Sequence, residues 1–258
     1  MGIRFVDRLK TSILWRFRLW TWGDRLRVGS KYIHREPSLI WPYVEKLIAL
    51  DRYERPERDL LVYMHSRGWI GRGDRVIEAG GGLGIMTMHI ADIVGDQSVV
   101  VFEPNPRTAS ALNRNLALNG HSIRLETAAL VPGERGEVSF ADTVDGGSFA
   151  TAGIAGETTT SQVINVPAEP ISGVIARLDP TVLVLDVEGA EFELLRSVED
   201  WGRVRAIHLE LHPEAFAAGQ LEALFAHMQR VGFRRERIPD FGPHIALLVK
   251  GNPESQFG

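Results

Sequence analysis

The stretch Arg75-Val-Ile-Glu-Ala-Gly-Gly-Gly-Leu-Gly84 decides the fold class. Its apolar run ends in the acid Glu78, and glycines follow at positions 80, 81, 82 and 84. Because glycine lacks a Cβ atom, such a loop can adopt positive φ and bring backbone N–H groups close to a ligand. The stretch predicts a buried strand, a tight loop and a helix, which is how parallel α/β sheets approach nucleotide-like molecules.

A second acid, Glu103, closes the next apolar run, Ser98-Val-Val-Val-Phe-Glu103. An acid at that place can accept two hydrogen bonds from a ribose diol. The dinucleotide fingerprint G-x-G-x-x-G/A needs a small residue where this chain has Ile85. The spacing G-x-G-x-G after Glu78 instead resembles motif I of the class I S-adenosylmethionine-dependent methyltransferases. A glycine motif alone leaves a merely tight turn open as the alternative.

Composition is that of a soluble globular chain, with 258 residues, 44% hydrophobic and 24% charged. The absence of cysteine excludes disulfides, thiolate nucleophiles and cysteine zinc sites, and fits a reducing compartment. No apolar run reaches the length of a membrane span, and the N-terminus lacks the apolar core of a cleaved signal. We therefore expect a cytoplasmic protein.

The net charge is −4, but the charges are distributed unevenly along the chain. Residues 1–35 carry nine basic residues against Asp7 and Asp24, interleaved with tryptophan, phenylalanine and tyrosine. Two interpretations remain open for this segment: a helical lid packed on the main domain, or a peripheral contact with an anionic membrane at its inner face. Nucleic acid is not expected as a partner, because the rest of the chain is acidic.

Hydrophobic periodicity predicts alternating strands and helices, and hence a doubly wound α/β fold. Strands are expected near 75–79, 98–103, 122–128, 181–186 and 205–211, with a final pair within 233–249. Helices are expected near 5–21, 39–67, 84–94, 106–119, 170–178, 190–198 and 219–231. The predicted organisation is a basic, aromatic-rich helical extension at 1–70, then one domain at 71–258 with a β-hairpin and loop insertion at about 134–168. The glycine- and threonine-rich part of that insertion, 143–160, is expected to be either a lid over the acceptor or a surface loop.

Polar side chains collect where the later strands end. Asp186 and Glu188 follow one apolar strand, and His208, Glu210 and His212 alternate along the next, so these three project to one face. Buried parallel strands normally carry apolar residues, so these groups are candidate catalytic residues. The alternatives are a hydrogen-bonded core role for His208 and a turn-capping role for His212.

Two further acids follow closely in the sequence. Glu191 lies in the first turn of the expected helix, where the helix dipole favours a carboxylate, and Glu193 is expected to face solvent. Neither is expected to take part in the chemistry.

Three motifs together identify a family resemblance. Asp186-Val-Glu-Gly-Ala-Glu191, Phe102-Glu-Pro-Asn-Pro106 and the asparagines that follow at 113, 115 and 119 resemble the hallmark segments of FkbM-type methyltransferases over about residues 70–250. The family often has an asparagine in its first loop where this chain has Gly82. The resemblance implies a Rossmann-like, seven-stranded, mostly parallel sheet with a C-terminal antiparallel strand pair. It also implies S-adenosylmethionine-dependent O-methylation, commonly of a sugar hydroxyl.

The resemblance and the positions of the residues together assign the donor site. The cofactor loop is expected to comprise Gly80, Gly81, Gly82 and Gly84. Glu78 is expected to order that loop or bind the amino group of the donor. Glu103 is expected to take the ribose hydroxyls, with Asn105 assisting. Thr127 and Ala128 are expected to flank the adenine.

Two hypotheses explain how the acceptor hydroxyl loses its proton. In the first, His212 or Glu210 is a general base and Asp186 orients it. In the second, Mg²⁺ or a related divalent ion is held by Asp186 and Glu210, with His212 as a further ligand, and lowers the pKa of the hydroxyl.

The acceptor is expected to be a carbohydrate or a glycosylated small molecule. The rival functions are an NAD-dependent, sugar-modifying oxidoreductase and a catalytically inactive nucleoside-binding module. A homo-oligomer is a further expectation.

Overall fold

The computed structural model describes residues 25–28, 30–34, 56–134, 136–143, 161–242 and 244–253. The helix expected at 5–21, most of the one expected at 39–67, and the loop at 144–160 therefore lie outside the described residues. Residues 56–66 are helical.

The central element is a seven-stranded sheet with the order β11-β12-β10-β9-β3-β4-β5. Five strands run parallel, and β12 is antiparallel to both β10 and β11. The strands are β3 (Val76–Ala79), β4 (Val99–Phe102), β5 (Arg124–Glu126), β9 (Val182–Leu185), β10 (Ala206–Glu210), β11 (Arg234–Arg235) and β12 (Ile245–Val249). The expected doubly wound, mostly parallel sheet with an antiparallel C-terminal pair is confirmed.

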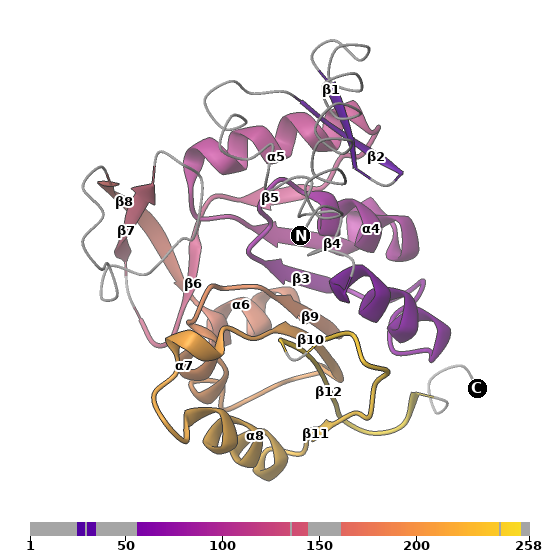
Figure 1. Cartoon of the computed structure of the whole chain (residues 1–258), viewed down its shortest axis with the longest axis vertical. Helices are drawn as coiled ribbons and strands as arrows, with labels where there is room; N and C mark the ends of the chain where they lie inside the picture. Colours follow the sequence, from indigo (N-terminus) through magenta and orange to yellow (C-terminus); the bar gives the residue numbers. More distant parts are fainter. Residues whose placement is uncertain are drawn as a thin grey trace, which may run out of the picture.

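Helices cover both faces of this sheet (Figure 1). One apolar cluster joins α4, α5 and residues 60–70 to one face, and a second joins α6, α7 and α8 to the other. The helices are α4 (Ile85–Val94), α5 (Pro106–Leu118), α6 (Ile171–Leu178), α7 (Glu191–Arg196) and α8 (Gln220–Arg230), with short 3-10 turns η1 (Asp96–Ser98) and η2 (Pro213–Ala215). Burial on both faces explains why the central strands are continuous apolar runs rather than alternating ones.

A smaller three-stranded sheet extends from the main one. Its order is β6-β8-β7, with bounds Ala129–Val131, Ser161–Pro170 and Glu137–Thr143. β7 pairs antiparallel with β8 over its whole length, and β6 pairs parallel with the end of β8. β6 continues the chain after β5, so this sheet stands next to the edge of the main sheet where β3 and β4 end (Figure 1).

The N-terminal region contains a β-hairpin that the sequence analysis does not predict. β1 (Arg25–Val28) pairs antiparallel with β2 (Lys31–His34). The backbone N–H groups of Tyr32 and His34 donate to the side-chain oxygens of Asn119 and Asn115 on α5, at 2.9 and 2.8 Å. Asn119 also donates to the carbonyl of Tyr32. The asparagines of this helix therefore hold a strand that is distant in sequence.

A buried ion pair stabilises the sheet at the ends where its parallel strands begin. Arg205 donates to both carboxylate oxygens of Asp74, at 2.7 and 2.8 Å. The hydroxyl of Thr181 and the backbone N–H of Gly71 donate to the same carboxylate. This network ties β3, β9 and β10 together at their starting ends.

Candidate functional site

The loop after β3 is closely packed against the strand ends around it. The N–H groups of Gly80 and Gly81 both donate to the carbonyl of Phe102 at the end of β4. Gly80 has φ +90°, and a Cβ atom there would lie 1.7 Å from the carbonyl oxygen of Asp186. Only glycine satisfies both the backbone conformation and this approach. The loop ends at Gly84, which caps α4 in a left-handed conformation.

Glu103 closes the loop from the side of β4. Its two carboxylate oxygens accept from the N–H groups of Gly82 and Asn105, each at 2.9 Å, and only 1% of its surface is exposed. Burial raises the pKa of Glu103 to about 7, although the two backbone hydrogen bonds oppose the rise. Each oxygen retains a further lone pair, which a ribose hydroxyl can use.

Asn105 has a structural role in this arrangement. Its side-chain oxygen accepts from the N–H groups of Arg107 and Thr108 and caps α5. The side chain is buried and does not line the cavity described next. Its assistance in ribose binding stays a prediction.

A cavity of about 670 Å³ opens where β3, β4 and β9 end. Its walls include Gly80 and Glu103 from the expected donor site, Ala128 after β5, and Asp186 and Glu188 after β9. Its volume lies in the range of about 300–1,000 Å³ that small-molecule sites have. The structure thus brings residues from both halves of the expected site to one cavity. Thr127, by contrast, is exposed and does not line it.

Glu78 lies in the middle of the sheet rather than on the cavity wall. Only 2% of its surface is exposed, and its Oε2 atom has no hydrogen-bond partner in the described part of the chain. Burial raises the pKa of Glu78 to about 8, and the charges of Asp186 and Glu103 add to the rise. At neutral pH this group is therefore mainly a neutral acid, which favours ordering the loop over pairing with an ammonium group.

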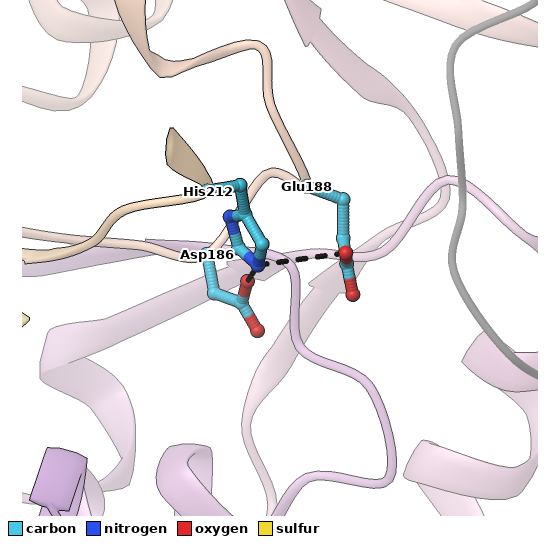
Figure 2. A group of neighbouring side chains, drawn as sticks. All are labelled: Asp186, Glu188 and His212. Carbon is cyan, nitrogen blue, oxygen red and sulfur yellow. Dashed lines mark ion pairs between the residues drawn. The ribbon is translucent and has the colours of Figure 1, made fainter. Parts of the chain in front are cut away.

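The second half of the site is built on the loop between β9 and α7. Glu188 has φ +50°, a conformation that costs a residue with a Cβ atom about 1–2 kcal/mol, and Gly189 follows with φ +99°. In this arrangement Asp186 Oδ1 and Glu188 Oε2 face Nε2 of His212, at 3.8 and 3.5 Å (Figure 2). Asp186 and Glu188 therefore line the cavity, and the imidazole of His212 lies beside them without lining it itself.

Glu191 fixes the imidazole, a role that the sequence analysis misses. It has no exposed surface, and its Oε1 accepts from Nδ1 of His212 at 2.8 Å and from the N–H of Gly189 at 3.0 Å. Glu191 does lie in the first turn of α7, but it acts as the partner of His212. The sequence does contain a hint of this role, because the spacing Gly189-Ala-Glu191 allows the carboxylate of Glu191 to accept a hydrogen bond from the loop that precedes it. Glu193 is exposed, as expected.

Charges around the imidazole control its protonation. Burial lowers the pKa of His212, but the hydrogen bond and charge of Glu191, with the charges of Glu188 and Asp186, outweigh burial and raise it to about 9. Burial and the charges of Glu210 and Glu188 raise the pKa of Asp186 well above its usual range. His212 is thus a cation at neutral pH in this form, and must lose a proton before it can act as a general base.

His208 and Glu210 both contact Glu57 in the helical residues 56–66, although the charge of Glu210 also acts on Asp186 and His212. Nε2 of His208 bonds to the carbonyl of Glu57 at 2.9 Å, and burial lowers the pKa of His208 to about 4. Burial and the neighbouring carboxyl of Glu57 raise the pKa of Glu210 to about 8. His208 is therefore a buried, neutral histidine of the core in this structure, and a catalytic role for it stays a prediction.

Within the described residues, one group of side chains has the spacing of a metal site: Asp186, Glu188 and His212, whose ligand atoms lie within 4.8 Å of one another. The sequence analysis pairs Asp186 with Glu210 as metal ligands. Glu210 is not part of this group, because its carboxyl turns toward Glu57.

The fold, the glycine loop and the acid after β4 define a class I, Rossmann-like methyltransferase domain. The family model described as the methyltransferase FkbM domain matches residues 86–235, which is more than half of the chain. The chain therefore belongs to the FkbM methyltransferase family, whose methyl donor is S-adenosylmethionine.

Other comparisons add little to this assignment. A search of curated proteins finds no match. Magnesium protoporphyrin IX methyltransferase from Synechocystis PCC 6803, solved with bound S-adenosylmethionine, is similar at 10% identity and a TM-score of 0.45, covering 83% of this chain and 85% of that one. Precorrin 8w decarboxylase from Methanobacterium thermoautotrophicum is similar at 16% identity and a TM-score of 0.41, covering 75% and 88%. With identities and scores this low, the family assignment depends on the family model.

The residues present fit the donor. A glycine-rich loop, a buried acid with a further lone pair on each oxygen and a cavity of suitable volume lie at the carboxyl ends of the strands, where ligands of such sheets bind. The bound donor supplies an electrophilic methyl group on a positively charged sulfur.

Proposed function

We propose that this protein transfers the methyl group of S-adenosylmethionine to a hydroxyl of a sugar, in a glycan, a glycolipid or a glycosylated small molecule. The observation that carries the proposal is the cavity itself, whose lining includes Gly80 and Glu103 of the expected donor site together with Asp186 and Glu188. A hydroxyl held by Asp186 and Glu188 would lie in the same cavity as the bound donor.

The chemistry requires little more than alignment and removal of a proton. The acceptor oxygen attacks the methyl carbon, the carbon–sulfur bond breaks, and the electron pair stays on sulfur, which becomes neutral. The hydroxyl proton passes to the group formed by Asp186, Glu188 and His212, once His212 has lost its own proton. Positioning the oxygen in line with the carbon–sulfur bond supplies most of the acceleration, and accepting the proton adds roughly 10²–10⁴-fold.

The cavity walls support a polyol as the acceptor. Carboxylates at Asp186 and Glu188 can each accept hydrogen bonds from neighbouring hydroxyls. Phe192 and Phe216 line the same cavity and offer apolar faces for the C–H side of a sugar ring, while Gln220 offers a donor and an acceptor. An acceptor with one isolated hydroxyl would leave part of this polar wall unpaired.

The decisive test compares glycan and lipid fractions from cells with and without the gene by mass spectrometry. We expect a species heavier by one methyl substitution only where the gene is present. Purified protein with isotopically labelled S-adenosylmethionine should then label the unmethylated fraction. If the label appears only on protein, nucleic acid or a non-glycosylated small molecule, the acceptor class is wrong.

Calorimetry separates the rival functions. S-adenosylmethionine should bind with one site per chain, and NAD should not bind. Binding of NAD alone would favour the oxidoreductase. Donor binding without methylation of any acceptor fraction would favour the inactive binding module.

The location of the protein in the cell and its contact with a membrane remain predictions. In the described part of the chain, no helix combines the length and hydropathy that a bilayer span requires. We propose that the basic segment at 1–35 makes a peripheral contact with the inner face of an anionic membrane. Retention on vesicles containing anionic lipid, lost at high salt, would support that contact.

A further inference from the structure

We propose that Asp186, Glu188 and His212 form a binding site for one divalent cation of the Mn²⁺ or Mg²⁺ type, with Glu191 as the residue that positions the histidine. The inference rests on the proposed function for the cation's role in catalysis, but the binding itself can be measured separately.

The orientation of His212 is the first argument. An ionised carboxylate only accepts hydrogen bonds, so the 2.8 Å contact with Glu191 makes Nδ1 the atom that carries a hydrogen. The remaining ring nitrogen, Nε2, points at the two carboxylates (Figure 2). Histidines that bind metals are commonly held in this way, with the other ring nitrogen donating to a carboxylate.

Buried carboxyl oxygens without hydrogen-bond partners are the second argument. Glu191 has no exposed surface, and its Oε2 has no hydrogen-bond partner among the described residues. Oδ1 of Asp186, the atom that faces Nε2, is also buried and has no hydrogen-bond partner there. None of the ion pairs between described residues brings a lysine or arginine to Asp186, Glu188 or Glu191. Three acidic side chains thus share one imidazole, and two of their buried oxygen atoms lack a partner among the described residues, which is costly for buried polar atoms and which a bound cation would supply.

The dimensions suit a small cation. With metal–ligand distances of about 2.0–2.2 Å, neighbouring ligand atoms of an octahedral ion lie about 3 Å apart and opposite ones about 4–4.4 Å apart. Nε2 of His212 lies 3.8 and 3.5 Å from the oxygens of Asp186 and Glu188, and all three atoms lie within 4.8 Å of one another, so they need to close in by less than about 1 Å. Two carboxylates and one imidazole, with no thiolate, favour a hard or intermediate divalent ion.

The position of the site gives the cation a function. Asp186 and Glu188 line the cavity that also contains the donor loop, and Asp186 keeps 38% of its side chain exposed. A cation there has coordination positions left for two neighbouring hydroxyls of an acceptor. It would hold them toward the donor and make the reacting hydroxyl more acidic.

Mn²⁺ binding measured by electron paramagnetic resonance, without donor or acceptor, tests the site directly. We expect one Mn²⁺ per chain in the wild type. Glu188→Gln removes a ligand from a half-buried loop and should weaken binding roughly 100-fold, and Glu191→Gln, which releases the imidazole, about 10–100-fold. Glu199→Gln, an exposed acid shortly after the same helix and outside the cavity lining, is the matched control and should bind as the wild type does.

Donor binding and thermal melting of each variant in the presence of a chelator show whether it is folded. The proposal is overturned if the wild type binds no Mn²⁺, or if folded Glu188→Gln binds it as tightly as the wild type. Methyl transfer that survives exhaustive chelation would overturn the catalytic role of the ion and leave the proposed function intact. Mn²⁺ binding without any donor binding would instead count against the proposed function.

Discussion

Replacing Glu78 with glutamine should stabilise the protein increasingly as the pH rises. Glu78 is 2% exposed, and burial raises its pKa from 4.5 to about 8. Below pH 4.5 this carboxyl is protonated in both folded and unfolded chains. As the pH rises above 4.5 the unfolded chain gains a solvated charge that the folded chain cannot accommodate, so stability is lost until the folded-state pKa is passed.

The magnitude follows from the two pKa values. Each pH unit between 4.5 and 8 costs the wild type about 1.4 kcal/mol, which amounts to about 3 kcal/mol at pH 7 and about 5 kcal/mol above pH 8. Glutamine has the shape of the neutral acid and cannot ionise. The difference between Glu78→Gln and the wild type should therefore grow with pH by that slope and then level off.

Urea unfolding followed by circular dichroism, at one-unit steps from pH 5 to pH 9, measures this difference. Any constant offset from changed hydrogen bonding drops out, because only the slope is interpreted. Glu199→Gln is the control, since Glu199 is exposed and its carboxylate is solvated in both states. A flat difference across the pH range for Glu78→Gln would show that Glu78 is ionised in the folded protein, and would refute the reasoning.

Three further predictions concern backbone strain and buried charge. Gly80→Ala puts a Cβ atom 1.7 Å from the Asp186 carbonyl oxygen; it should cost at least about 1–3 kcal/mol of stability and roughly 100-fold in methyl transfer, and wild-type values in melting and activity assays would contradict the close packing. Glu188→Gly relieves the positive φ at that position and should raise the free energy of unfolding by about 1 kcal/mol while abolishing Mn²⁺ binding; a less stable variant would argue against strain. Asp74→Asn leaves the buried Arg205 without its counter-charge and should lower the free energy of unfolding by about 3–5 kcal/mol, so a loss below 1 kcal/mol in denaturant titration would show that the pair is not essential.

Local signals in the sequence predict the main sheet well. Apolar runs that end in an acid or a glycine mark β3, β4 and β9, because strands buried on both faces cannot alternate. The asparagine and glycine at 119 and 120 correctly mark the end of α5. These features depend on neighbouring residues only, so a single chain is enough to read them.

Features that depend on distant contacts were missed. The β1–β2 hairpin has aromatic and basic residues that fit helical spacing as well, and its pairing is completed by Asn115 and Asn119 on α5. Alternation places His208 on one face of its strand, but the covering residue Glu57 is far away in sequence. Burial separates Glu191 from the exposed Glu193, and periodicity over so short a helix does not reveal it.

The close approach of Gly80 to the carbonyl of Asp186 joins two loops that we propose bind different molecules. With no side chain between them, a shift in either loop is passed directly to the other. Substitutions that change the acceptor specificity should therefore be poorly tolerated at this contact. They should be better tolerated elsewhere in the cavity lining, at Leu130–Val131 and at Phe216 and Gln220. The enzyme can in this way change what it methylates without disturbing the geometry by which the methyl group is delivered.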